Sequence, residues 1–193
     1  MLGIVQDISN DEMQRLWGYI LSNEFRKPGL FSLRTLDSVR NISQAEAQIF
    51  EKLAGLMFDS EPYEDQSFER SYGADTCAAG VLCPGIMRDL RKHLHQNEIE
   101  RLVDAGFLVT NQLRRGYLPP PTEDRTLQVR IGGHRFRIVI AEGLSRAPVD
   151  YLPITQAARE LSMVVTPDLS KGYLVDLTEQ LGKNSCSLQP STE

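Results

Sequence analysis

The sequence predicts an α+β protein that is mostly helical, in which an N-terminal helical bundle packs on a second unit that carries a long β-hairpin. Apolar residues recur at helical spacing over residues 9–57. On both sides of Gly132-Gly133, apolar and polar residues alternate as they do in paired strands. With 193 residues and 41% hydrophobic content, the chain can form one substantial domain or two small ones that share an interface.

A single apolar stripe near the N-terminus predicts the first helix. Its members lie at positions i, i+3, i+4, i+7 and i+8, namely Met13, Leu16, Trp17, Ile20 and Leu21. Ser9 and Glu12 have the spacing of a capping box, and Trp17, the only tryptophan, is expected to anchor the core. The Pro28-Gly29 break ends this helix.

Two further helices complete the predicted bundle. Ser32 can cap a short helix, and Ser43 with Glu46 forms a second capping box in front of a longer one. The expected apolar positions are Leu33, Leu36 and Val39 in the short helix and Ala45, Ile49, Leu53, Leu56 and Met57 in the longer one. Glu24 and Arg34, which flank the Pro-Gly break, are expected to form a structural salt bridge.

Charge is unevenly distributed along the chain, whose formal net charge is −5. Residues 1–85 carry 7 Lys and Arg against 13 Asp and Glu, residues 86–146 carry 11 against 7, and residues 147–193 carry 3 against 6. The middle third is therefore a basic island in an acidic protein. The acidic total argues against a protein that coats nucleic acid over its whole surface.

The chain between the bundle and the hairpin is predicted to be a loop followed by two helices. Residues 59–85 are rich in acidic residues without a sustained period, which is typical of a solvated acidic loop. Residues 86–94 then suggest a short helix. A second helix, capped by Asn97 and ended by Gly106, leads into a strand at residues 107–109.

Residues 127–140 have the clearest β pattern in the chain, with Gly132-Gly133 as a two-residue hairpin turn. Pairing across this turn places apolar residues on one face of the hairpin. The other face shows Arg130 opposite Arg135 and Gln128 opposite Arg137. Like charges that lie opposite each other are destabilising unless an acidic group neutralises them. This face is therefore the strongest functional indication in the sequence.

The segments on either side of the hairpin carry weaker signals. The Arg- and Pro-rich residues 114–121 are expected to stay outside any sheet, because proline cannot donate to a ladder. After the hairpin we expect a short strand at residues 152–154, a helix capped by Thr155, and a last helix that Gly182 ends. Residues 183–193 are predicted to be a disordered tail.

The order of elements from Ser43 onward resembles a winged helix-turn-helix. Residues 102–109 are similar to the end of a recognition helix that runs into the first wing strand, and residues 152–161 are similar to the L-T-x-x-G-R-x-L entry to the next helix, with Ala158 where that pattern has glycine. The resemblance implies a winged-helix-like unit with a long β-hairpin wing. The implied division is 1–58 helical bundle, 59–85 acidic loop or linker, 86–182 winged-helix-like unit and 183–193 tail.

Residues 11–21 and 28–36 resemble the signature D-E-x-M-Q-x-L-W-G-x-I-L … P-G-x-F-S-L-R-T-L of an uncharacterised bacterial family of domains of unknown function. The likeness continues through residues 45–50 to Tyr173. This family implies a fold but no established activity, and its members are expected to have more chain before this point, so the start looks shortened. A similar helical unit occurs in some proteins linked to abortive phage infection.

No catalytic or metal-binding constellation is predicted. Cys77, Cys83, His93 and His95 do not have the spacing of standard zinc ligands. The chain has no G-x-S-x-G motif, its histidines have no triad context, and the glycine pair at the hairpin turn lacks the strand-then-helix setting of a phosphate loop. We therefore expect a non-enzymatic protein with no cofactor and no metal.

A cytoplasmic protein without membrane contact is predicted. No apolar run reaches the ~20 residues that a membrane span needs, and the first residues lack the features of a signal peptide. The cysteines Cys77, Cys83 and Cys186 form an odd set without framework spacing, which fits free thiols in a reducing compartment.

The basic island supports two hypotheses about function, and its candidate residues are Arg101, Arg114, Arg115, Arg130, Arg135 and Arg137. They could contact nucleic-acid phosphates, with the helix of residues 97–105 in a groove, as in a DNA-binding transcriptional regulator that uses its basic wing. They could instead dock the acidic residues 59–75 or a protein partner. Because that helix carries Glu98, Glu100 and Asp104, it is poorly suited to approach a polyanion.

The sequence therefore favours an interaction or regulatory module of a bacterial cytoplasm, with a protein partner or self-association and a role in phage defence.

Overall fold

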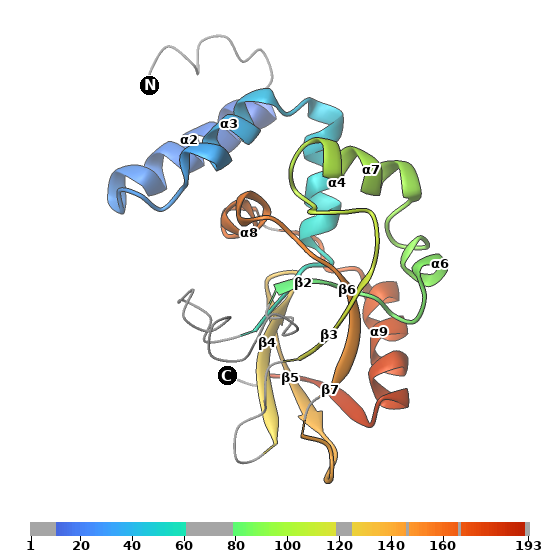
Figure 1. Ribbon diagram of the computed structural model, residues 1–193. Helices are drawn as coiled ribbons and strands as arrows, with labels where there is room; N and C mark the ends of the chain where they lie inside the picture. Colours follow the sequence, from blue (N-terminus) through green and yellow to red (C-terminus); the bar gives the residue numbers. More distant parts are fainter. Residues whose placement is uncertain (1–10, 61–78, 119–124, 146, 166, 192–193) are drawn as a thin grey trace.

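The computed structural model describes residues 11–60, 79–118, 125–145, 147–165 and 167–191. Its centre is a curled antiparallel sheet of seven strands, a half-barrel in shape, with helices above it and along one side (Figure 1). The strands follow the order β3 (Arg114–Tyr117), β6 (Pro148–Leu152), β2 (Ala79–Leu82), β1 (Phe58–Ser60), β4 (Thr126–Ile131), β5 (His134–Ile140) and β7 (Cys186–Pro190).

The helices of the described residues form two groups. An N-terminal group extends from one end of the sheet and consists of α2 (Asp11–Arg26), α3 (Leu33–Asn41) and α4 (Gln44–Ala54). The remaining helices are α6 (Met87–Leu90), α7 (Gln96–Asp104), α8 (Gln156–Ser162) and α9 (Lys171–Lys183).

The prediction of a mostly helical bundle with a winged-helix unit is therefore wrong. The hairpin that was expected to project as a wing lies inside the sheet, because β1 pairs with β4 and β7 pairs with β5. The error has a physical cause. The strands β1, β2, β3 and β6 have only 3, 4, 4 and 5 residues, so their alternation is too brief to register as a pattern.

The register predicted around the glycine turn is confirmed. Arg130 pairs with Arg135, and Gln128 pairs with Arg137. Gly132 and Gly133 have φ values of 53° and 78°, which glycine adopts without strain. A Cβ atom on Gly132 would lie 2.7 Å from the carbonyl oxygen of Gly55, so the turn also packs tightly against the end of α4.

Two of the three predicted caps of the N-terminal helices are confirmed, and so is part of their predicted core, although Ala45 is exposed and the side chains of Met13 and Leu16 lie outside the described residues. Ser32 accepts a hydrogen bond from the N–H of Thr35, and Ser43 with Glu46 forms the expected capping box. Trp17 is buried with 3% of its surface exposed, whereas Leu33, expected to be buried, is 81% exposed. The predicted cap Ser9 lies outside the described residues.

The Pro-Gly break is closed differently from the prediction. Glu24 accepts hydrogen bonds from the N–H groups of Gly29 and Phe31, and the described residues show no ion pair between it and Arg34. The backbone donors lower the pKa of Glu24, with Gly29 as the main cause. This carboxylate therefore caps the turn between α2 and α3.

Two predictions about the chain beyond the acidic segment differ from the structure. α7 begins after His95, whose N–H donates to Glu98, and not at Asn97. Gly106, with φ 78°, ends α7 as expected. The strand predicted at residues 107–109 is only an isolated bridge between Leu108 and Ile154. α7 packs against α4, where Lys52 and Glu98 form an ion pair of 2.8 Å.

Several segments that were expected to stay outside any sheet form strands. Residues 79–82, at the end of the predicted acidic loop, form β2. β3, in the Arg- and Pro-rich segment, pairs with β6, and the three prolines that follow it lie outside the described residues. The predicted disordered tail forms β7, which pairs with β5 through Cys186, Leu188 and their neighbours. α9 continues through Gly182 to Lys183. These segments are too short to show a strand pattern by themselves, and pairing with strands distant in the sequence stabilises them.

α9 covers the sheet beside β6 (Figure 1). Its buried side chains are Tyr173, Leu177 and Leu181, and the hydroxyl of Tyr173 donates a 2.7 Å hydrogen bond to the carbonyl of Leu82 in β2. The capping residue predicted for α8 is confirmed, because Thr155 accepts a hydrogen bond from the N–H of Ala158. The helix α8 lies under α3 and links the N-terminal helices to the sheet.

Candidate interaction surface

The structure separates the six arginines that the sequence singled out. Arg130, Arg135 and Arg137 lie on one face of β4 and β5. Arg114 and Arg115 lie on β3, and three strands of the sheet lie between β3 and β4. Arg101 is exposed on α7. A single site containing all six is therefore not formed.

The first group of arginines belongs to a surface that we call the arginine face. Residues directly opposite each other in a sheet share a face, so the pairings extend this surface from β1 to β7. Asp59 lies opposite Arg130, and Gln189 lies opposite Arg137. The arginine face thus comprises Asp59, Gln128, Arg130, Arg135, Arg137 and Gln189.

Asp59 joins the arginine face to α8. Its carboxylate lies 3.3 Å from a guanidinium nitrogen of Arg130 and 3.0 Å from one of Arg159. The Asp59 side chain is 21% exposed, so the three charged groups are partly removed from water. The hypothesis that the arginines dock an acidic segment involves residues 59–75, of which 61–75 lie outside the described residues.

Asp59 is protonated more readily than an exposed aspartate, because its pKa is raised. Burial raises the pKa of Asp59, while Arg159 and Arg130 act in the opposite direction and only partly offset this effect. Desolvation therefore outweighs two nearby cations. This is consistent with a group held between a sheet and a helix.

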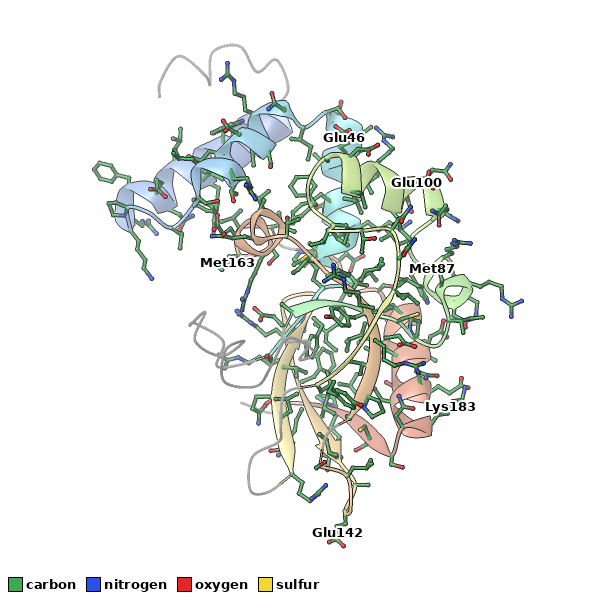
Figure 2. The ribbon with its side chains drawn as sticks, in the orientation of Figure 1. Glu46, Met87, Glu100, Glu142, Met163 and Lys183 are labelled. Carbon is green, nitrogen blue, oxygen red and sulfur yellow. The ribbon has the colours of Figure 1, made fainter. Side chains whose placement is uncertain are left out.

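A small hollow of about 50 Å³ lies next to these charges. Asp59, Arg130 and Arg159 line it, together with Met163, which follows α8 and is labelled in Figure 2. Pockets for drug-sized ligands have volumes of roughly 300–1,000 Å³. The hollow is therefore too small for an organic substrate of that size.

Arg137 differs from its neighbours on the arginine face. Its Nε is buried and has no hydrogen-bond partner among the described residues. The rest of this side chain lies in a partly buried position between Gln128 and Gln189. A buried donor without an acceptor is unfavourable, so this guanidinium favours an acceptor on its face.

The sequence did not identify Arg159 or Gln189 as members of this surface. Asp59 belongs to the acidic residues 59–75 that one hypothesis places against the arginines, and it contacts Arg130. Arg159 lies in a helix whose apolar pattern was the only local signal, and Gln189 lies in the segment expected to be disordered. The sequence signal that indicates β7 is the alternation of apolar and polar residues over positions 186–189. In the structure, Cys186 and Leu188 are accordingly more buried than Ser187 and Gln189.

The described residues that were considered for a zinc site do not form a metal site. The described part of the chain contains no group of three or more His, Cys, Asp or Glu residues that could hold a metal ion. His93 lies 2.8 Å from Asp176 and packs edge-on against Tyr173. Cys83 is buried, and burial raises its pKa to about 11, so its thiol is protonated at neutral pH. Cys77 lies outside the described residues.

Helices long and apolar enough to cross a membrane were not found among the described residues. The molecule is thus a helix-covered, curled antiparallel sheet that carries an arginine-rich face. The chain belongs to the DUF2806 family, described as a protein of unknown function, whose model matches residues 1–178. This confirms the predicted membership of an uncharacterised family. Comparisons with curated proteins and with solved structures gave no match.

Proposed function

We propose that this protein is a non-enzymatic interaction module that binds an acidic surface of a partner protein through the arginine face. The observation that supports this proposal is the register of β4 and β5, which aligns Arg130, Arg135 and Arg137 on one side of the sheet. Guanidinium groups recognise carboxylates in a planar, bidentate geometry. The cytoplasmic, regulatory role predicted from the sequence belongs to this proposal.

The composition of the arginine face favours a protein partner over nucleic acid. Its described residues include no aromatic side chain on which a base could stack, since Phe136 points to the opposite face. One carboxylate, Asp59, is part of the face. The helix α7, once expected to enter a groove, packs against α4 and pairs its Glu98 with Lys52.

Nucleic-acid binding is the second candidate function. The observation that favours it is the presence of Gln128 and Gln189 beside the arginines, because amide and guanidinium groups together also contact phosphates and sugars. The two candidates differ in salt dependence. Binding to a polyanionic backbone weakens steeply as salt releases counterions.

Fluorescence anisotropy with three labelled probes tests the proposal. The probes are a polyglutamate peptide, duplex DNA and single-stranded DNA, each titrated at low and moderate salt. The test variant combines Arg135→Glu with Arg137→Gln, and the matched control combines Arg34→Glu with Arg40→Gln, which makes the same charge change on exposed residues of α3. We expect the test variant to weaken peptide binding by roughly tenfold or more, and the control to leave it unchanged.

Three results would contradict the proposal. The first is no binding of polyglutamate by the natural chain at low salt. The second is an equal loss in both variants, which would indicate an effect of net charge alone. The third is tighter, steeply salt-dependent binding of DNA that only the Arg135 and Arg137 variant loses, which would establish the nucleic-acid alternative.

A further inference from the structure

Each of the two edge strands, β3 and β7, points alternate backbone N–H and C=O groups to a side where no other described strand pairs with it. In an antiparallel ladder, hydrogen-bonded and non-hydrogen-bonded pairs alternate. The N–H of Leu118 donates to Ala147, so counting back along β3 makes Gly116 with Val149 and Arg114 with Tyr151 the bonded pairs.

It follows that Arg115 and Tyr117 point their backbone N–H and C=O groups away from β6, toward the open edge. A second bond supports this assignment. The N–H of Cys83 donates to the carbonyl of Asp150, the residue opposite Arg115, so the main chain of Asp150 faces β2. The backbone N–H groups of Arg115 and Tyr117 make no hydrogen bond with another described residue.

The other edge strand, β7, ends at a proline. The N–H of Ser191 donates to Arg135, and the N–H of Ala141 donates to Ser185, which makes Cys186, Leu188 and Pro190 the outward positions. Pro190 has no N–H, and proline on an edge strand discourages the addition of another strand. β7 therefore offers two outward N–H groups, those of Cys186 and Leu188, the same number as β3, so the side chains and the cavity beside β3 distinguish the two edges.

The side chains beside the β3 edge differ between its two faces. Arg114 is exposed on one face and makes no ion pair with a described residue. Arg115 and Tyr117 lie on the other face, where Arg115 pairs with Asp150 at 3.2 Å. The face that carries Arg114 therefore offers a cation to a partner, whereas on the other face Asp150 neutralises the charge of Arg115.

The second face also has a cavity of about 350 Å³ between β3, β6 and α9. Apolar side chains of α9, Leu177 and Leu181, line it, and Gln180 and Asn184 add polar groups. Cys83 and Tyr117 complete the wall nearest β3 and β2. This volume is sufficient to receive a large apolar side chain.

We propose that β3 binds an extended segment of a partner protein as an eighth strand of the sheet, with acidic side chains beside Arg114 and apolar side chains toward the cavity. The backbone edge supplies affinity, and the alternating side chains supply specificity. A second copy of this chain fits poorly at the same edge, because pairing β3 with β3 would bring four arginines together. This inference does not depend on the arginine face.

Anisotropy with a labelled peptide of alternating glutamate and valine tests this proposal on the full chain. The decisive control is the same peptide with N-methyl groups at alternate residues of its bonding edge, which removes backbone donors and leaves the protein unchanged. We expect N-methylation to abolish binding, and Arg114→Glu to weaken it about tenfold. Tyr117→Pro, which removes one outward N–H, should also abolish binding, whereas Tyr117→Phe should preserve it.

The proposal fails if the unmodified peptide does not bind at millimolar concentration, or if the N-methylated peptide binds equally well. It also fails if the Arg135→Glu, Arg137→Gln variant loses peptide binding while Arg114→Glu does not, since the peptide would then be bound by the arginine face. If Arg114→Glu weakens binding of the peptide and the Arg135→Glu, Arg137→Gln variant does not, the peptide binds at the β3 edge. This conclusion holds whether or not the arginine face binds polyglutamate.

Discussion

Asp59 shows how a single residue can join two parts of this fold. It lies on β1, contacts Arg130 across the sheet, and contacts Arg159 from α8. Replacing or protonating a partly buried carboxylate affects both ion pairs, because each depends on its charge. The same residue is the carboxylate of the arginine face, so it limits how strongly that face attracts an anion.

The raised pKa of Asp59 predicts a specific pH dependence of stability. Since burial raises the pKa in the folded state, the folded protein binds this proton more readily than the unfolded chain does, and acidification favours folding through this group. This contribution is fully present below the unfolded pKa and is lost as the pH rises through the folded pKa. We expect the free energy of unfolding of the natural chain, minus that of Asp59→Asn, to increase from pH 7 to pH 4 in urea titrations.

Subtracting the free energy of unfolding of Asp59→Asn removes the contribution of the other carboxyl groups. One of these is Glu46, whose pKa is lowered by its hydrogen bonds to Ser43, so that acid weakens its contribution to stability. A difference that stays constant or decreases on acidification would show that the two arginines, and not burial, dominate at Asp59.

Among the elements, the contact between α3 and α8 depends on one buried carboxylate. Glu160 of α8 is 8% exposed and accepts hydrogen bonds from the N–H of Ser32 at 2.7 Å and the hydroxyl of Thr35 at 2.6 Å. These donors lie at the N-terminus of α3, where a negative charge also interacts favourably with the helix dipole. Glu160 therefore attaches the α2–α3 pair to the rest of the protein.

Replacing Glu160 is expected to loosen this pair of helices. Glu160→Gln keeps an oxygen for both donors but removes the charge that strengthens their hydrogen bonds and interacts with the α3 dipole, and we expect a loss of roughly 1–2 kcal/mol. The lone tryptophan, Trp17 of α2, is buried, so its fluorescence should shift to the red at lower urea than the loss of the circular dichroism signal. Glu100→Gln on the exposed side of α7, labelled in Figure 2, is the matched control and should change neither transition.

If both transitions of Glu160→Gln coincide with those of the natural chain, Glu160 does not hold α3 in place.

In the whole molecule, the half-barrel depends on strands that are distant in sequence. β7 closes one side by pairing five residues with β5, and Cys186 in this strand is 4% exposed. Without β7, the backbone of β5 would lose its partner on one side, and Ile140 would lose its neighbour Cys186. A sheet edge exposed in this way promotes aggregation.

Truncation tests the contribution of β7. A chain that ends at Lys183 is expected to lose about 3 kcal/mol or more of its free energy of unfolding, from the side chains that are no longer buried and the ladder that is no longer formed. Chemical denaturation together with light scattering measures the loss and any aggregation. Gln189→Ala, an exposed position on the same strand, should have little effect. Unchanged stability of the truncated chain would support the original expectation of a disordered tail.

The sequence was most informative where the signals are local. The caps Ser32, Ser43 and Thr155, and the register about the hairpin turn, could all be predicted, because each depends on residues within a few positions of one another. Part of the candidate surface followed from that register, since Arg130, Arg135 and Arg137 had to share a face.

Only the tertiary structure decided how these elements combine. Leu82 pairs with Tyr151, and Phe58 pairs with Ile131, across separations that no local pattern encodes, so the sheet and its two edges could not be predicted. The same holds for Arg159 and Asp59, which contact each other across a hundred residues. Short strands acquire their stability from partners brought together by the core, and for this reason a chain with helical signals folds around a sheet.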